Sequence, residues 1–295
     1  MTFTYDISKY TPAQLCAIPM VILVLSLILL GFTYMQTGLP VTPGIEFQGG
    51  ISVTVMTDDT ADEISAIFAQ FPLISINEGI GGGRYILFES MSDSEFREFA
   101  LLIDQVYPAA NINQTGETFG KTLQSQALMA LFFSFIGMSI VISLVFRNIV
   151  PAFAVIIASL ADIVMTAAVM NIVGIQLSLG TMAALLMLIA FSVDSDVLLT
   201  TRILRRQGKF DEKIQGAFRT GWAMATTTLG AIFAMWVVST WAQITIISEM
   251  SAVLLIGLLF DLMNTWLTNA GILKWHSEGG TLSNLFKPRK KGGRS

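Results

Sequence analysis

Residues 177–206 read LSLGTMAALLMLIAFSVDSDVLLTTRILRR. The first half is an unbroken apolar run, and about 20 such residues are enough to cross a hydrocarbon core of roughly 30 Å. The second half carries Asp194 and Asp196 and ends in the basic sequence RILRR, which is typical of the cytoplasmic flank of a membrane span. We therefore expect a membrane-spanning helix whose inner half is polar.

The rest of the chain has the composition of a membrane protein. Of its 295 residues, 53% are hydrophobic and 13% are charged, whereas about a quarter are charged in a soluble domain. Six apolar stretches are long enough to cross a membrane: 14–35, 125–146, 149–172, 177–201, 220–240 and 244–272. No small-residue cleavage site follows the first stretch, so we interpret it as a retained anchor. The predicted fold class is an integral membrane α-helical bundle of six transmembrane helices.

The distribution of charge predicts the orientation of this bundle. Residues 36–124 hold three Lys or Arg against twelve Asp or Glu. The other 14 basic residues lie in the terminal tails (1–13 and 273–295), at Arg147, or between 202 and 219. Because cytoplasmic loops are enriched in Lys and Arg, we expect both termini in the cytoplasm of a cell membrane protein and the acidic segment outside.

The acidic segment has the pattern of a small domain. Its alternating and periodic stretches predict the order β-α-β-β-α-β, which is typical of a ferredoxin-like α+β domain. Both helices are predicted to start at capping boxes, Thr60–Glu63 and Ser92–Glu95. We expect the first strand to span IEFQGGISVTV (45–55), in which Gly49 and Gly50 indicate a bulge or a close backbone approach. The domain is therefore predicted to bind or position rather than to catalyse.

The glycine-rich sequence at 79–83 is interpreted as a hairpin turn. A phosphate-binding loop is the alternative, but no helix opens after it and no Lys-Ser/Thr pair follows. Cys16 and His276 are the single residues of their types, and we find no spacing that suits a metal. We accordingly predict no metal site, no cofactor and no enzymatic activity.

Acidic side chains within the apolar stretches are the candidate functional residues. Asp162, Asp194, Asp196 and Asp261 lie in three of the predicted spans, and an aspartate at the centre of a span costs about 2.5 to 3.5 kcal/mol. They are expected to face the bundle interior, a water-filled cavity or a partner. Each could serve only as a hydrogen-bonded structural group, but intramembrane acids more often mark an ion or substrate path.

Helical geometry separates the two acids of the opening segment. At about 100° per residue, Asp194 and Asp196 point roughly 160° apart, so they cannot form one paired-carboxylate site. Asp196 can reach Thr200 at i+4, while Ser195 lies on the same face as Arg202 two turns later. We therefore expect two polar stripes, at least one of which faces other polypeptide.

Several stretches, in order along almost the whole chain, resemble the SecF family, the smaller subunits of the SecDF complexes of protein export in the resistance-nodulation-division superfamily. They are GIEFQGG, ETFGKTLQSQALMAL, VFRNIVPAFAVIIASLADI, GTMAALLMLIAFSVDSDVLLTTRILR, RTGWAMATTTLGA and IGLLFDLMNTWLTNAGILKW. The family's central aspartate falls on Ser195, which is flanked here by Asp194 and Asp196, and its arginine falls on Arg202. These residues, with Asp162 and Asp261, are the candidates for a proton relay or a polar helix interface.

The resemblance implies an accessory to the protein translocation channel that uses the proton gradient to promote export. The implied partners are a SecD-like subunit, the Sec channel, exported polypeptides and membrane lipid, with no nucleic acid. A small-molecule or lipid exporter of the same superfamily is the alternative function. An intramembrane aspartyl protease is disfavoured, because no aspartate lies in a Gly-x-Gly-Asp sequence.

Overall fold

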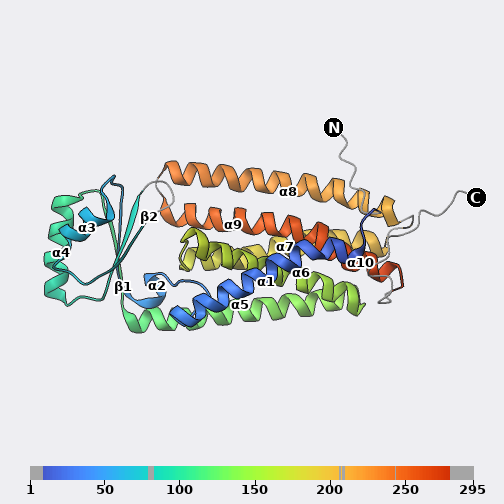
Figure 1. Ribbon diagram of the computed structural model, residues 1–295, viewed down its shortest axis with the longest axis horizontal. Coiled ribbons are helices and arrows are strands. Elements are labelled where there is room, and N and C mark those ends of the chain that lie inside the picture. The colour runs from blue at the N-terminus through green and yellow to red at the C-terminus, as the bar shows by residue number, and fades with distance from the viewer. Residues whose placement is uncertain (1–8, 79–82, 206, 208–209, 243, 280–295) are drawn as a thin grey trace, which may run out of the picture.

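The computed structural model describes residues 9–78, 83–205, 207, 210–242 and 244–279. It shows an elongated molecule in which a bundle of long helices carries a small sheet domain at one end (Figure 1). We call this end of the bundle the domain end and the other the far end. Residues 79–82 of the predicted glycine turn (79–83), Arg206 and most of both tails lie outside the described residues.

Six helices of the described chain are long and apolar enough to cross a membrane. They are α1 (Pro12–Thr37), α5 (Glu117–Phe146), α6 (Ile149–Val173), α7 (Leu179–Arg205), α8 (Phe210–Trp241), and α9 (Thr245–Met263) with its continuation through the π-helix η1 (Asn264–Asn269) and α10 (Ala270–Ser277). The predicted membrane bundle is confirmed. Several helices extend beyond the apolar stretches, because their ends contain polar residues that a hydropathy pattern does not include.

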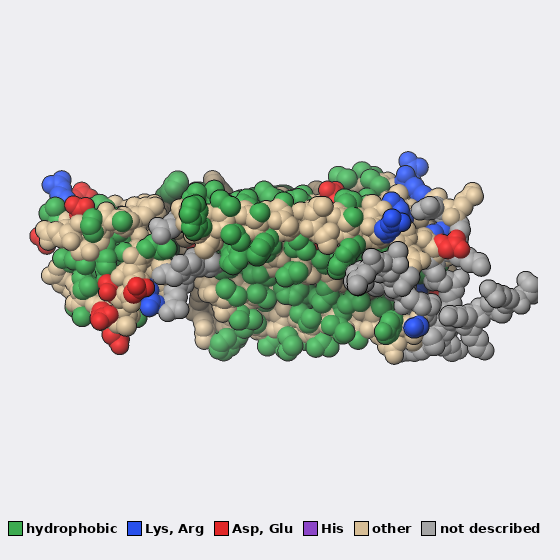
Figure 2. Space-filling model, turned by 90° about the horizontal axis from the view of Figure 1, so that it is seen from above, with side chains coloured by type: hydrophobic (Ala, Val, Ile, Leu, Met, Phe, Trp, Pro, Cys, Tyr) green, Lys and Arg blue, Asp and Glu red, His purple; other side chains and the backbone are tan. Residues whose placement is uncertain are grey.

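Helix burial shows which spans are central. In the most apolar window of α6, 67% of the residues are buried inside the protein, and α7 has 44%, whereas α5 and α8 have only 6% and 11%. The side of the bundle on which α8 lies presents a broad hydrophobic surface in the middle of the molecule (Figures 1 and 2). Acidic side chains lie mainly on the sheet domain and basic ones mainly at the far end, as the charge distribution in the sequence requires (Figure 2).

The sheet domain has the predicted ferredoxin-like order. The strands β1 (Gly50–Val55), β2 (Leu73–Glu78), β3 (Arg84–Phe88) and β4 (Asn111–Thr115) form an antiparallel sheet in the order β2-β3-β1-β4. The helices α3 (Ala61–Ile67) and α4 (Asp93–Val106) follow β1 and β3 and cover the face that points away from the bundle (Figure 1). Both begin at the predicted capping boxes.

Alternation along β1 divides the two faces of the sheet. Ile51, Val53 and Val55 are buried and pack in one core with Phe68, which follows α3, and Phe99 of α4. Phe99 lies 4.6 Å from Phe88 between ring centroids, in an edge-on arrangement that aromatic pairs favour. Side chains between these positions point to the opposite face, so β1 presents polar groups to the bundle.

The prediction that the first strand begins at residue 45 is wrong. IEFQ forms the short helix α2 (Ile45–Gln48), and the strand starts only at Gly50. Gly49 and Gly50 have φ angles of 81° and 120°, which L side chains rarely adopt. A Cβ atom on Gly50 would lie 2.5 Å from the carbonyl oxygen of Phe88. The two glycines therefore let the chain turn from α2 into a strand that lies tightly against β3.

A hydrogen bond inside the domain gives it a testable pH dependence. The Tyr107 hydroxyl donates to Asp59 Oδ2 over 2.6 Å, and this bond is the main cause that lowers the pKa of Asp59. The bond thus stabilises the fold above the unfolded pKa of about 4, and this contribution is lost as the pH falls through the folded pKa.

Tyr107→Phe removes the donor and is expected to weaken this dependence. Between about pH 5 and pH 3, the melting temperature of the variant should fall less steeply than that of the wild type. Parallel thermal melts at several pH values measure the difference. Identical slopes for the two proteins would contradict the assignment.

Candidate functional site

Three of the four intramembrane aspartates converge in the middle of the bundle. Asp162 on α6 and Asp196 on α7 are both 0% exposed, and Asp261 on α9 is 4% exposed. Their neighbours are serine, threonine and asparagine side chains of the same helices and of η1. We call this group the carboxyl cluster; its members are Ser159, Asp162, Ser192, Ser195, Asp196, Thr200, Asp261, Asn264, Thr265 and Asn269.

Asp162 joins three helical segments at one side of the cluster. Its Oδ2 accepts a hydrogen bond of 2.6 Å from Ser192 on α7. Its Oδ1 accepts one of 2.7 Å from Asn264 Nδ2 in η1. The Ser192 hydroxyl also lies 3.1 Å from that of Ser159 on α6. Asp162 thus ties α6 to both neighbouring spans.

Asp261 lies at the centre of the cluster. The Ser195 hydroxyl is 2.8 Å and 2.9 Å from its two carboxyl oxygens. The Thr265 hydroxyl, one turn later, is 3.2 Å from its Oδ1. The same hydroxyl is 2.9 Å from Asp196 Oδ1, so Thr265 bridges Asp261 and Asp196.

The cluster contains no positive partner for its acids. Every hydrogen bond to the three carboxyls within the described chain comes from Ser, Thr or Asn. Three buried acids without a cation cannot all be ionised at an acceptable cost, because an isolated buried charge is strongly unfavourable. The arrangement is therefore suited to binding and releasing protons.

The π-helix η1 supplies three of the five residues that donate to the carboxyls of the cluster, and it was not predicted. Its sequence NTWLTN (264–269) places Asn264, Thr265 and Asn269 in the buried core. A π turn shifts the backbone hydrogen bonds by one residue, and such turns occur frequently at functional sites. The sequence signal that could have indicated this polar segment is the presence of four polar residues within an apolar stretch.

Asp194 and Arg202 lie outside the cluster. Asp194 is exposed on α7 while Asp196 is buried, which agrees with the predicted separation of the two side chains. Arg202 donates to the carbonyl of Gly216 over 2.9 Å and to the Thr220 hydroxyl over 3.0 Å, both on α8. The arginine that the resemblance carries over therefore joins α7 to α8, and its hydrogen bonds within the described chain go to a carbonyl and a hydroxyl.

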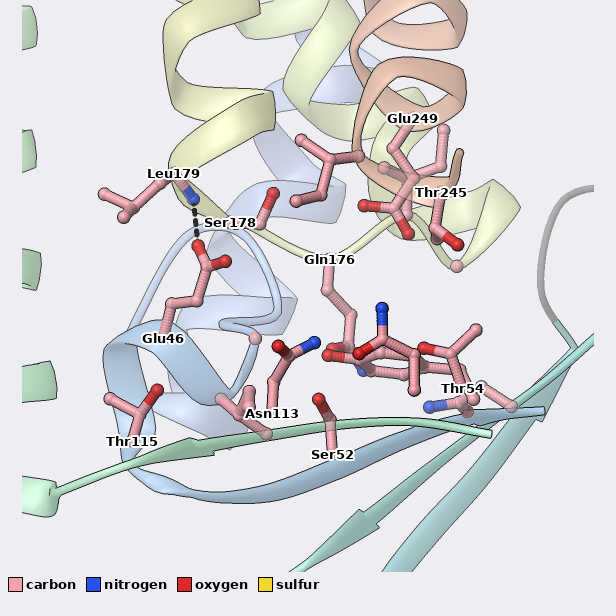
Figure 3. A pocket seen from close by; sticks show the side chains of 18 of the residues that line it. Glu46, Ser52, Thr54, Asn113, Thr115, Gln176, Ser178, Leu179, Thr245 and Glu249 are labelled. Carbon is pink, nitrogen blue, oxygen red and sulfur yellow. Dashed lines mark hydrogen bonds between the residues drawn. The ribbon is translucent and has the colours of Figure 1, made fainter. Parts of the chain in front are cut away.

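A second polar site lies between the sheet and the domain ends of the spans (Figure 3). It is a cavity of about 600 Å³, and we call it the domain-end cavity. Its floor holds the cross-strand pairs Ser52 with Asn113 and Thr54 with Asn111, from β1 and β4. Its roof includes Gln176, Ser178, Thr245 and Glu249, and Figure 3 shows their side chains around the same space.

Glu46 fixes one wall of this cavity. Its carboxylate accepts a hydrogen bond from the backbone amide of Leu179, the first residue of α7 (Figure 3). A carboxylate at a helix N-terminus pairs with an otherwise unsatisfied amide and with the positive end of the helix dipole. The GIEFQGG sequence therefore connects the sheet domain to α7.

Burial and nearby acids also affect a tyrosine of the cavity. Burial is the main cause that raises the pKa of Tyr85 on β3 to about 12, and the nearby Glu249 and Glu46 contribute to this rise. Tyr85 therefore remains a neutral hydrogen-bonding group at physiological pH. The only charged side chains that line the cavity among the described residues are the two glutamates.

Taken together, a bundle of six apolar helices and a ferredoxin-like domain at one end define a multi-pass membrane protein with a small α+β domain. Residues 101–279 match the family described as "Protein export membrane protein SecD/SecF, C-terminal". The chain belongs to this family, and its relatives over nearly the full length are SecF proteins, which confirms the resemblance found in the sequence.

Two relatives show how far the similarity extends. The protein-export membrane protein SecF of Methanolacinia petrolearia is 52% identical over 94% of this chain and 98% of its own length. SecF of Haloferax volcanii is 39% identical over 93% of this chain and 96% of its own length. Both relatives are archaeal, as is the SecF of Pyrococcus furiosus, which is 37% identical over 89% of this chain.

A solved structure shares the fold. The structure of SecDF, described as a translocon-associated membrane protein, from Thermus thermophilus matches with a TM-score of 0.73 and 18% sequence identity. The match covers 92% of this chain but only 40% of that protein. At this identity the likeness establishes the common fold of the helices and the sheet domain.

Proposed function

We propose that this chain acts as the SecF subunit of a protein-export accessory complex and promotes the translocation of exported polypeptides. Full-length similarity to proteins named for export supports this role. In this proposal the protein resides in the plasma membrane with both termini in the cytoplasm and the sheet domain outside. It binds no cofactor and catalyses no chemical reaction of its own.

A SecD-like subunit is the proposed partner. The Thermus SecDF chain is more than twice as long as the part that matches here, which leaves room for a second half in a separate chain. The exposed position of Asp194 on a spanning helix carries this proposal, since a carboxyl that faces lipid is costly. A partner helix that offers a hydrogen-bond donor would relieve this cost.

Small side chains next to Asp194 would allow such a helix to approach closely. Ala183 and Ala190 lie on the same exposed stripe of α7, eleven and four residues before Asp194, which is about three turns and one turn away. Small residues permit close helix contacts in membranes. We therefore expect the partner to lie along α7.

Cysteine cross-linking tests this placement. In a complex purified with the SecD-like chain, Ala190→Cys should cross-link to cysteines introduced into the partner's spanning helices. Ile28→Cys is the control, because Ile28 is 63% exposed on α1, which packs mainly against α6. Recovery of this chain without any SecD-like partner, or cross-linking from α1 but not from α7, would refute the assembly.

The proton gradient is the proposed energy source. One charge that crosses 100 mV gains about 2.3 kcal/mol, enough to bias a conformational change. Glu249 lines the domain-end cavity, and Asp261 lies twelve residues further along the same helix, about 18 Å at 1.5 Å per residue. The two sites thus place exchangeable acids at the edge and in the centre of the membrane.

A further inference from the structure

Two buried oxygen atoms in the carboxyl cluster lack hydrogen-bond donors. They are Asp196 Oδ2 and Asn269 Oδ1, and both residues are 0% exposed. A buried polar atom without a partner is rare in a folded protein and requires an explanation. Here the two unpartnered atoms belong to side chains that already contact each other.

The hydrogen bond between these two side chains uses the other polar atom of each group. Asn269 Nδ2 donates to Asp196 Oδ1 over 2.8 Å. Thr265 donates to the same oxygen over 2.9 Å, and a longer contact of 3.5 Å links Asn269 Nδ2 to the Thr200 hydroxyl. Asp196 therefore has one oxygen with two donors and one oxygen with none.

A carboxyl proton would complete this pair. If Asp196 carries a proton on Oδ2, the O–H group can donate to Asn269 Oδ1 while Asn269 Nδ2 continues to donate to Asp196 Oδ1. Acid and amide then form a closed ring of two hydrogen bonds. Both unpartnered oxygens are satisfied at once, and no further atom is needed.

The supply of donors in the cluster favours the protonated form. An ionised carboxylate can accept about four hydrogen bonds, and three acids share the donors of Ser192, Ser195, Thr265, Asn264 and Asn269. The Thr265 hydroxyl has one hydrogen, so it cannot donate to Asp196 and Asp261 together. The charged groups that face Asp196 are also acids, Asp261 on α9 and Asp162 on α6, and both oppose a further negative charge.

We infer that Asp196 and Asn269 form a proton-binding site, in which a neutral Asp196 donates to the amide oxygen of Asn269. Proton uptake forms the Oδ2–H bond, and release breaks it and returns the proton to water or to a neighbouring acid. Release also leaves the Asn269 oxygen without a donor. Because Asn269 is the last residue of η1, proton exchange is coupled to the π-helix that links α9 to α10.

Infrared spectroscopy of the purified complex in lipid tests this inference. At neutral pH, Asp196→Asn should remove a carbonyl band of a protonated carboxyl, and deuterium oxide should shift that band in the wild type. Asp104→Asn is the reference, because Asp104 is exposed on α4 and should lose only the bands of an ionised carboxylate. Loss of carboxylate bands in Asp196→Asn would overturn the inference and point to a water or a cation between the two oxygens.

A second variant probes the amide. Asn269→Leu should shift the Asp196 carboxyl band, since the carbonyl oxygen Oδ1 loses one of its two donors and the Oδ2–H group loses its acceptor. An ionised Asp196 would give no band in that region to shift. Asp196→Asn can keep both hydrogen bonds as an amide pair, so its melting temperature should stay close to that of the wild type. The biological role of this proton site rests on the proposed function in export. The spectroscopic test does not, because the band reports the protonation of Asp196 even if the chain takes no part in export.

Discussion

Asp261→Asn is expected to abolish the part of protein export that depends on the proton gradient. Asp261 accepts hydrogen bonds from Ser195 and shares Thr265 with Asp196, so it connects the acids of the carboxyl cluster. Asparagine preserves the size and most contacts of the side chain but cannot bind and release a proton. Loss of a positioned proton-transfer group typically lowers a rate by about 10²-fold or more.

Vesicles that contain the full complex and the channel provide the measurement. Translocation of a precursor protein is compared with and without an imposed gradient, together with proton flux. Asp104→Asn is the matched control, because it makes the same chemical change at an exposed position of the sheet domain. If Asp261→Asn responds to the gradient as strongly as the wild type, the carboxyl cluster does not serve as a relay.

Gly120→Ala is expected to loosen the packing of α2 against α5. A Cβ atom on Gly120 would lie 2.9 Å from the amide nitrogen of Gly49 and 3.1 Å from the carbonyl group of Phe47. All of these are backbone atoms, which cannot move aside as a flexible side chain can. Overpacking of this kind costs about 1 to 3 kcal/mol, and here it acts on the contact between α2 and α5.

Gly137→Ala is a matched control in the same helix, because nothing lies within 4 Å of the Cβ atom that it adds. Both substitutions gain about 1 kcal/mol of helix propensity, so their difference isolates the steric effect. Thermal unfolding and limited proteolysis of the segment before β1 should distinguish them. Equal melting temperatures and equal cleavage rates for the two variants would show that α2 moves away from the added methyl group without loss of stability.

The bundle and the domain order could be predicted because their signals are local. Apolar runs define the spans, and the capping boxes at Thr60 and Ser92 define where two helices begin. The start of the first strand was mispredicted because IEFQ has the alternation of a strand. Its helical form depends on contacts with α5 and α7, which are distant in sequence.

The site was only partly predictable. The sequence identifies the aspartates, and helical geometry separates Asp194 from Asp196, but it does not show which acids of different helices meet. That depends on the rotation of each helix within the bundle. The roles of Thr265 and Asn269 depend on η1, and a π turn follows from tertiary packing rather than from a residue pattern.

The connection between β4 and α5 has a mechanical consequence. Strand β4 ends at Thr115 and α5 begins at Glu117, so Gly116 alone separates them. With 30 residues, α5 is about 45 Å long, and it acts as a rigid lever with almost no slack at its tip. A tilt of only about 5° around its far end would displace β4 by about 4 Å, so a small rearrangement of α5 deep in the membrane would produce a larger displacement of the sheet domain.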